Sequence, residues 1–415
     1  MSEVSEKSKK AKEATCALSM TTTEERNAAL LKIADLLDEK SQEIIAENKK
    51  DLDAGMESGL TKALLDRLAL DKARISGISA GVRQIVALQD PIGEVISRWE
   101  RPNGLIIEKV RVPLGVIGMI YEARPNVTVD SAALALKTAN AIVLRGGSTA
   151  INSNKAIVKV MHEALAMTNI SKDVVQLIEN TDRATAQEIL KMDKYLDVLI
   201  PRGGAGLIRN VVENSTVPVL ETGVGNCHVY VDEDANPEMA VAIVVNSKAN
   251  RPAVCNAAET LLVHEQWAKQ HLSMLVAALR DKGVELRGCE KARAIIPDMK
   301  EATEDDWHEE YLNLIMAVRI VDSLENAVQH IADYGSNHTE AIVTDNIENA
   351  RYFIKSVDAA AVNHNASTRF TDGFEYGFGA EIGISTQKLH ARGPMGLPEL
   401  TSYKYCVYGN GQIRG

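Results

Sequence analysis

Residues 116–144 read VIGMIYEARPNVTVDSAALALKTANAIVL, and this stretch decides the fold class. The apolar run over 116–121 predicts a buried strand, the small residues over 130–139 predict a helix, and 141–144 predicts a second buried strand. A strand, a helix and a strand in this order form a βαβ unit with parallel strands. The stretch therefore predicts an α/β domain built on a parallel sheet.

The same alternation continues along the chain. Strands are predicted at 174–178, 196–200 and 217–220, with helices at 149–167, 183–192 and 205–212. A second series predicts helices at 236–249, 266–282, 323–333 and 346–356, and strands at 260–264, 284–287, 314–320, 340–344 and 359–363, with an acidic, irregular stretch at 298–310. We therefore expect two doubly wound parallel-sheet domains.

The segments that flank these two series have different sequence patterns. Residues 1–90 have helical periodicity, and 92–112 predicts a β-hairpin that turns at Pro102-Asn103-Gly104. The alternation over 401–408 predicts a last strand, which can join the hairpin in a sheet shared between subunits. We expect a dinucleotide-binding domain over 1–225, a catalytic domain over 226–363 and a return segment with an oligomerisation strand over 364–415. A homo-oligomer follows, with dimer and tetramer both open.

Composition excludes several classes of protein. The 415 residues carry a net charge of -11, which argues against a general nucleic-acid or membrane-surface binder. The sequence has no apolar run long enough to span a membrane, and its polar first ten residues are not those of a signal peptide. The five cysteines lack C-x-x-C pairs and the nine histidines lack metal-ligand spacing. We expect a cytoplasmic protein without disulfides or a metal site.

Cys255 is the first candidate for chemistry. It lies in a polar turn of small residues between a predicted helix and a predicted strand, where a thiol can be exposed and have a lowered pKa. Lys248 and Arg251, just upstream, can supply the positive field that lowers it. A lone cysteine is, however, more often a buried core residue, so the turn alone does not assign a nucleophile.

Four further motifs follow predicted strands, where parallel sheets bind ligands. The runs LRGGS (144–148) and IPRGGAG (200–206) each open a helix, so their glycines can let a phosphate approach backbone N–H groups, or simply form tight turns. Glu221 can act as a general base or be a solvated surface carboxylate. In the run after residue 121, Asn126 can donate to an oxyanion and Arg124 can hold a carboxylate or phosphate, although Asn after Pro is also ordinary turn chemistry.

Taken together, these motifs resemble the aldehyde dehydrogenase superfamily over nearly the whole chain. The shared order is Asn126, Arg145 and Ser148, Gly203 and Gly204, Glu221, Cys255. Three longer runs, 121–126, 321–340 and 381–395, resemble the members that reduce γ-glutamyl phosphate in proline biosynthesis. The resemblance implies an aldehyde-dehydrogenase-like fold: two doubly wound parallel-sheet domains with an oligomerisation arm made from the hairpin and the C-terminal strand.

The resemblance also implies roles. Cys255 is the expected nucleophile that forms a thioester, Asn126 and the Cys255 backbone N–H are the expected oxyanion donors, and Glu310 is expected to hold the nicotinamide ribose. Glu221 either helps to deprotonate Cys255 or lines the site. Candidates for the phosphate and the α-carboxylate are Arg124, Arg251, Asn363 and Arg392.

The expected cofactor follows from two positions at which this chain differs from the superfamily. Its cofactor strand commonly ends in a lysine followed three residues later by a glutamate that binds the adenosine ribose, and this chain has Arg145 and Ser148 there. Losing the carboxylate favours a 2′-phosphate and hence NADPH. A glutamate 5-kinase is the implied partner, because acyl phosphates hydrolyse readily. The rival readings are a coenzyme A-acylating or hydrolytic aldehyde dehydrogenase, and a catalytically silent member of the family.

Overall fold

The computed structural model describes residues 1–122 and 124–414 and divides the chain into two compact units. Unit 1 comprises Met1–Glu221, Phe378–Gly383 and Met395–Gly415, and unit 2 comprises Thr222–Gly377 and Ile384–Pro394. The expected return segment over 364–415 is therefore divided between the two units. Among the described residues, no helix is both long and apolar enough to cross a membrane.

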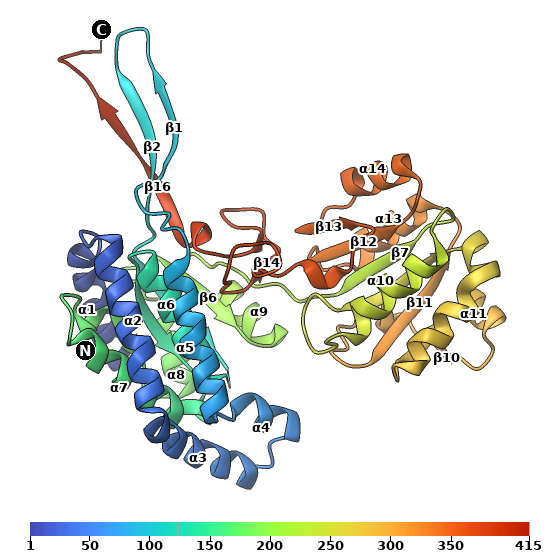
Figure 1. Ribbon diagram of the computed structural model, residues 1–415, viewed down its shortest axis with the longest axis horizontal. Coiled ribbons are helices and arrows are strands. Elements are labelled where there is room, and N and C mark those ends of the chain that lie inside the picture. Colours follow the sequence, from blue (N-terminus) through green and yellow to red (C-terminus); the bar gives the residue numbers. More distant parts are fainter. Residues whose placement is uncertain (123, 415) are drawn as a thin grey trace. The chain divides into compact units, whose positions relative to one another are not determined.

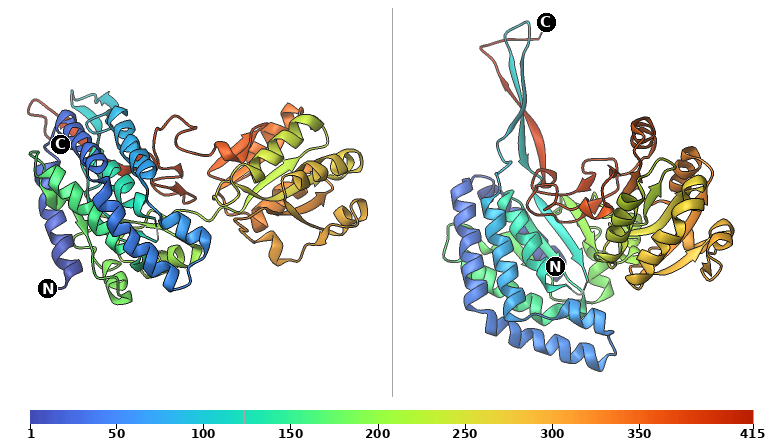
Figure 2. Two further views of the ribbon diagram at one scale, coloured as in Figure 1. Left: turned by 60° about the horizontal axis from the view of Figure 1, so that its bottom comes forward. Right: turned by 45° about the vertical axis from the view of Figure 1, so that its right-hand side comes forward.

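Five helices open unit 1, as their periodicity predicts. Side chains cap two of their N-termini in a typical way: Thr22 and Glu25 form a capping box at α2, and the Asp71 side chain accepts a hydrogen bond from the Arg74 N–H at α5. In Figures 1 and 2, α2 and α5 lie side by side. The helices are α1 (Glu3–Leu18), α2 (Thr23–Glu39), α3 (Ser41–Glu57), α4 (Lys62–Leu68) and α5 (Lys72–Ala87).

A four-stranded parallel sheet forms the centre of unit 1, in the order β5-β4-β3-β6. All six residues of β3 are buried, as expected for a central strand covered on both faces. Because β3 lies between β4 and β6, the loops that follow these three strands meet at one edge of the sheet. The strands are β3 (Val116–Tyr121), β4 (Ala141–Arg145), β5 (Val175–Leu177) and β6 (Val198–Arg202); the helices are α6 (Pro125–Lys137), α7 (Ile151–Leu165), α8 (Arg183–Ile189) and α9 (Ala205–Asn214), with 3₁₀ turns η1 (Ser148–Ala150) and η2 (Lys172–Val174).

Two sequence predictions in unit 1 need correction. The strand expected at 217–220 is reduced to one isolated bridge between Leu199 and Val219. The helix expected from Asp130 begins five residues earlier, at Pro125, because proline suits the first position of a helix. The earlier start places Asn126 within the first turn of α6.

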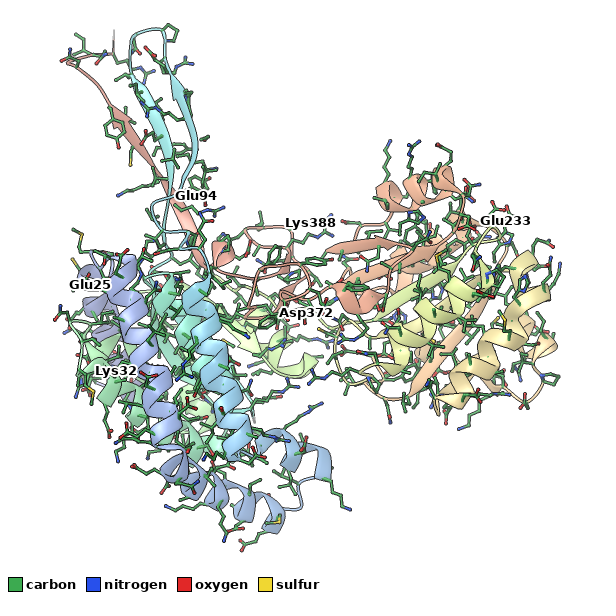
Figure 3. The ribbon with its side chains drawn as sticks, viewed as in Figure 1. Glu25, Lys32, Glu94, Glu233, Asp372 and Lys388 are labelled. Atoms are coloured by element: carbon green, nitrogen blue, oxygen red, sulfur yellow. The ribbon has the colours of Figure 1, made fainter. Side chains whose placement is uncertain are left out.

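The predicted hairpin and C-terminal strand form an antiparallel arm on unit 1, in the order β1-β2-β16 (Figure 1). Its strands are β1 (Val95–Glu100), β2 (Ile106–Pro113) and β16 (Thr401–Tyr408), which follows the 3₁₀ turn η5 (Pro398–Leu400). β16 pairs along its whole length with β2 of the same chain, so one chain completes this sheet by itself. Figure 3 shows Glu94 at the foot of the arm, where its carboxylate pairs with Arg111 at 2.6 Å.

Unit 2 contains a seven-stranded parallel sheet, in the order β10-β9-β11-β8-β7-β12-β13. Two apolar clusters bury its faces, one under α10 and α11 and one under α13 and α14. The strands are β7 (Cys227–Val231), β8 (Ala258–His264), β9 (Glu285–Gly288), β10 (Lys300–Glu301), β11 (Ile315–Val321), β12 (Thr339–Val343) and β13 (Ala361–His364); the helices are α10 (Pro237–Ala249), α11 (Glu265–Asp281), α12 (Glu290–Ile295), α13 (Leu324–Tyr334) and α14 (Ile347–Ser356).

In the seven-stranded sheet and the helices that cover it, the sequence did not predict the central strand β7, helix α12 and the short strand β10. The irregular stretch at 298–310 contains β10 and the 3₁₀ turn η3 (Asp305–Trp307). The remaining elements of unit 2 are the 3₁₀ turn η4 (Thr368–Phe370) and a two-stranded antiparallel sheet of β14 (Ile384–Ser385) and β15 (Gly393–Pro394).

Candidate active site

The turn that carries Cys255 connects α10 to β8 and is pressed against the start of β7. A Cβ atom at Gly225 would lie 1.6 Å from the carbonyl oxygen of Cys255, so only glycine fits there. The buried thiol of Cys227 donates a hydrogen bond to the same oxygen over 3.1 Å. The Cys255 side chain itself is partly exposed. The contacts thus hold the backbone of this residue and leave its thiol accessible.

The guanidinium group of Arg369 lies within electrostatic reach of this thiol, and Arg251 lies within electrostatic reach of Arg369. The Arg369 side chain donates through Nε to Asn250 Oδ1 (3.3 Å), and its carbonyl oxygen accepts from Asn256 Nδ2 (3.4 Å), so Arg369 is tied to both ends of the turn. Burial lowers the pKa of Arg369, the negative charge of Asp372 raises it, the charge of Arg251 lowers it, and a charge on Cys255 raises it. Nearby positive charge favours the thiolate form of a cysteine. Arg251 was expected here; Arg369 was missed, because its segment has no periodicity.

Glu310 also contacts Gly225. Its Oε1 accepts the Gly225 N–H over 2.7 Å, and burial is the main cause that raises its pKa. Unit 2 therefore brings both Cys255 and Glu310 against one glycine.

A buried ion pair supports the segment that contains Glu310. Lys248 on α10 and Glu259 on β8 pair with each other, and neither side chain is exposed. The second oxygen of Glu259 accepts the N–H of Leu312 over 3.3 Å. Leu312 has a φ of 51°, in the left-handed region that a leucine rarely adopts. Burial raises the pKa of Glu259 to about 7, although its lysine partner opposes that shift.

The other two substrate candidates of unit 2 already have partners. Asn363, on β13, donates through Nδ2 to the carbonyl oxygen of Ser367 over 3.0 Å. Arg392 forms an ion pair with Asp358 at 2.7 Å, and Lys388 pairs with the same carboxylate (Figure 3 labels Lys388). Arg392 is thus engaged by a carboxylate, whereas the Arg369 side chain is tied to the Cys255 turn.

In unit 1, Gly203 and Gly204 follow β6 and open α9. The Gly204 N–H donates to Glu122 Oε2 over 3.2 Å, and a Cβ at Gly203 would lie 2.7 Å from the carboxyl carbon of Glu122. A carboxylate thus occupies the N-terminus of a helix, which is a favourable place for any anion. Glu122 was missed, although it directly follows the central strand of the predicted sheet.

Arg145 ends β4 on the neighbouring strand. It donates through Nη2 to the carbonyl oxygens of Thr181 (2.8 Å) and Asp182 (3.3 Å), while its buried Nε has no hydrogen-bond partner. Burial lowers its pKa, and no ion pair to a described carboxylate neutralises its charge. Ser148, three residues on, is exposed at the start of η1. This edge therefore carries a desolvated cation and an exposed hydroxyl group.

The N-terminus of α7, which the LRGGS run was expected to offer to a phosphate, is already capped. Asp51 of α3 accepts the backbone N–H of Asn152 (3.2 Å) and of Ser153 (2.8 Å). A phosphate at this end of α7 would have to displace a buried carboxylate. The start of α9 is the more accessible of the two helix N-termini.

Asn126, Arg124 and Glu221 complete the expected residues of unit 1. Asn126 donates through Nδ2 to Asp130 Oδ2 over 2.9 Å, and burial raises the pKa of Asp130 to about 6. Arg124 is the exposed N-cap residue of α6. Glu221 follows Leu220, whose N–H donates to the carbonyl oxygen of Leu199 over 2.8 Å. Asp130 is a further residue that the sequence reading did not single out.

The site chemistry rests on thiol, amide, carboxylate and guanidinium groups. Over residues 1–122 and 124–414, no group of three or more His, Cys, Asp or Glu side chains could hold a metal ion.

Comparison with known proteins relates this geometry to a family. The sequence model of the aldehyde dehydrogenase family matches residues 1–288. The gamma-glutamyl phosphate reductase of Halalkalibacterium halodurans is 59% identical over 415 residues, 100% of both chains, and that of Moorella thermoacetica is 60% identical over 412 residues, 99% of each. The crystal structure of gamma-glutamyl phosphate reductase from Thermotoga maritima has a TM-score of 0.98 and 53% identity and covers 100% of both chains.

Proposed function

Because the chain belongs to the aldehyde dehydrogenase family, and within it to the gamma-glutamyl phosphate reductases, we propose that it reduces γ-glutamyl 5-phosphate to glutamate 5-semialdehyde and phosphate. The reaction is a step of proline biosynthesis, it uses NADPH, and it passes through a thioester on Cys255. The observation that carries the proposal is the Cys255 turn, in which Gly225 and Cys227 fix the backbone and the Arg369 guanidinium group lies within electrostatic reach of the thiol.

The first half of the reaction is acyl transfer to sulfur. The Cys255 thiolate attacks the acyl carbon, and the Asn126 amide and the Cys255 backbone N–H stabilise the oxyanion that forms. The carbon–sulfur bond forms, the carbon–oxygen bond to phosphate breaks, and phosphate leaves with the electron pair. Glu221 either helps to deprotonate Cys255 beforehand or lines the site.

In the second half, the thioester becomes an aldehyde. NADPH, when bound, supplies the hydride for this reduction. The same two donors stabilise the oxyanion of the thiohemiacetal, and Cys255 accepts the electron pair of the carbon–sulfur bond as the aldehyde forms. The thiolate is thereby regenerated without a general acid.

For the substrate anions, the proposed ligands are Arg124, Arg251, Asn363 and Arg392, to which Arg369 is added. Arg369 is favoured because its side chain is tied to the Cys255 turn through Asn250. Arg392 would have to exchange its present partner, Asp358, for substrate. A guanidinium group can grip a phosphate or a carboxylate with two hydrogen bonds.

For the cofactor, the proposed ligands are Arg145, Ser148, Gly203, Gly204 and Glu310. Two observations fit an adenine dinucleotide 2′-phosphate: the unpartnered buried Nε of Arg145 and the absence of a carboxylate at Ser148. The Glu122 carboxylate on the Gly204 N–H is a stand-in for a phosphate oxygen at the start of α9. Glu310 would hold the nicotinamide ribose, which NADPH and NADH share, so the preference for NADPH over NADH rests on Arg145 and Ser148.

Three further proposals concern the setting of the enzyme. Five free cysteines fit a reducing compartment, the cytoplasm. The arm supports a homo-oligomer, because both of its faces carry exposed apolar side chains. Transfer of the acyl phosphate from a glutamate 5-kinase would protect it from water.

The test is the reverse reaction of the purified enzyme. Glutamate 5-semialdehyde should reduce NADP⁺ only when phosphate is added, and NAD⁺ should be a much poorer acceptor. Turnover that needs coenzyme A in place of phosphate would support a coenzyme A-acylating enzyme, and turnover without either would support a hydrolytic one. Absence of all three activities, with no thiol reacting faster than the others toward iodoacetamide, would support a catalytically silent protein.

A further inference from the structure

We propose that Asp130 is a positioning residue that fixes which end of the Asn126 amide is offered to the substrate. The inference rests on the proposed function, in which Asn126 donates a hydrogen bond to the oxyanion. It adds a residue that touches neither substrate nor cofactor and acts through Asn126 alone.

The two residues are one helical turn apart on α6, and their side chains meet. Asn126 Nδ2 donates to Asp130 Oδ2 over 2.9 Å. An ionised carboxylate has only acceptor atoms, so the amide must turn its NH₂ end toward it. The opposite orientation would set the amide oxygen against a negative charge. Because an NH₂ group has two hydrogens, one remains available to the oxyanion after Asp130 has taken the other.

The helix that carries this pair is itself held firmly. Tyr121 at the end of β3 and Thr128 of α6 share a hydrogen bond of 2.7 Å, and the Thr128 hydroxyl donates to Asn154 of α7 over 2.9 Å. All three side chains are buried. This chain of hydrogen bonds joins α6 to the sheet and to α7, so an oriented amide on its first turn stays in place.

The energetic setting separates this pair from an ordinary helix-surface pair. Burial raises the pKa of Asp130 to about 6, which means that the site disfavours the charge that orients the amide. Gln329 and Asp333 on α13 form the same amide–carboxylate pair at the same spacing, over 2.8 Å, but in an exposed position. A disfavoured charge kept beside a proposed oxyanion donor is typical of a functional site.

A double-mutant cycle tests the inference. The variants are Asn126→Ala, Asp130→Asn, the double variant, and Asp333→Asn as the matched control, each assayed for phosphate-dependent NADP⁺ reduction. Asn126→Ala should lower kcat by roughly 10² to 10³, as for loss of one oxyanion donor. Asp130→Asn should lower kcat by about tenfold with little change in KM, because an amide at 130 accepts either orientation of Asn126. The double variant should be no slower than Asn126→Ala, and the control should match the wild type.

Two further measurements separate positioning from folding. The midpoint of thermal unfolding of Asp130→Asn should be no lower than that of the wild type, and the rate of Cys255 alkylation by iodoacetamide should not change. Asp130→Ala should repeat the loss of kcat if the asparagine variant folds poorly.

Three outcomes would overturn the inference. If Asn126→Ala is impaired but Asp130→Asn and Asp130→Ala stay within twofold of wild type, Asp130 does not position the amide. If the losses multiply in the double variant, Asp130 acts by another route. If Asn126→Ala keeps full activity, the oxyanion role in the proposed function fails, and the inference fails with it.

Discussion

At the scale of single residues, the carbonyl oxygen of Cys255 sets the geometry of the proposed site. It excludes any side chain at Gly225 and accepts the thiol hydrogen of Cys227. The N–H of Gly225 in turn donates to Glu310. The proposed nucleophile and the proposed ribose ligand thus both contact one glycine, so displacement of either one is expected to affect the other.

Arg145 is predicted to set the cofactor preference. Arg145→Ala should lower kcat/KM for NADPH by about tenfold to a hundredfold, the loss expected for a charge-assisted contact worth about 1.5–3 kcal/mol. The value for NADH should change much less, since NADH has no 2′-phosphate. Steady-state kinetics with both cofactors measure this, and Arg67→Ala on α4 is a control that removes the same charge. Equal losses with both cofactors would show that Arg145 does not read the 2′-phosphate.

Asp130→Asn is predicted to stabilise the protein while it slows the reaction. A carboxyl whose pKa is raised to about 6 favours folding when protonated and opposes it when ionised. Ionised Asp130 therefore lowers the free energy of unfolding by its full amount above pH 6, and this effect fades as the pH falls toward 4. Raising the pKa to about 6 corresponds to at most ~3 kcal/mol, and for this partly exposed side chain we expect about 1–2 kcal/mol.

Calorimetric unfolding of wild type and variant measures this gain. The variant should have the higher midpoint at pH 8, and the difference should shrink as the pH is lowered toward 5. A variant that is less stable than wild type at pH 8 would show that the Asp130 charge stabilises the fold.

The sequence could identify residues whose chemistry is visible along the chain, and it could not identify those defined by contacts. Cys255 and Asn126 follow from a turn composition and a strand-end motif that the family shares. Glu122 and Arg369 can be recognised only from contacts between segments that are distant in the sequence. Asp130 can be recognised only once α6 is known to begin at Pro125, which places it one turn after Asn126. The hydrogen bond between Glu122 and Gly204, for example, joins residues 82 positions apart.

At the scale of elements, the Lys248–Glu259 pair joins α10 to β8 across the Cys255 turn. Glu259→Ala should lower the free energy of unfolding by about 3–5 kcal/mol, because it leaves a buried ammonium group without its partner. The double variant Lys248→Met/Glu259→Met should recover most of this stability. It should still bind cofactor less tightly, because Leu312 has lost the carboxylate that accepts its N–H.

Urea denaturation followed by tryptophan fluorescence measures the change, since Trp267 and Trp307 are both buried in unit 2. Glu6→Ala, which removes an exposed ion pair with Lys10 on α1, is the control and should leave the midpoint unchanged. A double variant as unstable as Glu259→Ala would contradict the desolvation argument.

Periodicity predicted most elements of both sheets, and local exceptions explain what it missed. Strand β7 begins with Cys227-His228, directly after the expected domain boundary between residues 225 and 226, and the sequence pattern did not predict it. The expected strand at 217–220 has the right composition but only one bridging partner. Strand propensity describes a half-buried surface, and pairing decides whether a ladder forms.

At the scale of the whole molecule, the arm predicts association. All residues of β1 are exposed, and Tyr405 and Val407 on β16 are each 57% exposed. Exposed apolar side chains gathered on one element are typical of an interaction surface, so another surface is expected to cover this sheet. A second copy of the chain is the proposed cover.

The variant Tyr405→Lys/Val407→Lys should therefore shift the enzyme to a smaller species in analytical ultracentrifugation. Ser402→Lys/Lys404→Glu, on the opposite face of the same strand, is the control for disturbance of the strand itself. Both wild type and the lysine variant sedimenting as a monomer would contradict an oligomerisation role for the arm.

The central claim is that Cys255 carries the acyl group, and one assay tests it most directly. Phosphate-dependent reduction of NADP⁺ by glutamate 5-semialdehyde should fall at least about a thousandfold in Cys255→Ser, because a neutral hydroxyl is a far weaker nucleophile than a thiolate. Cys16→Ser, on the exposed surface of α1, should match the wild type. Activity of Cys255→Ser within tenfold of wild type would contradict the thioester mechanism.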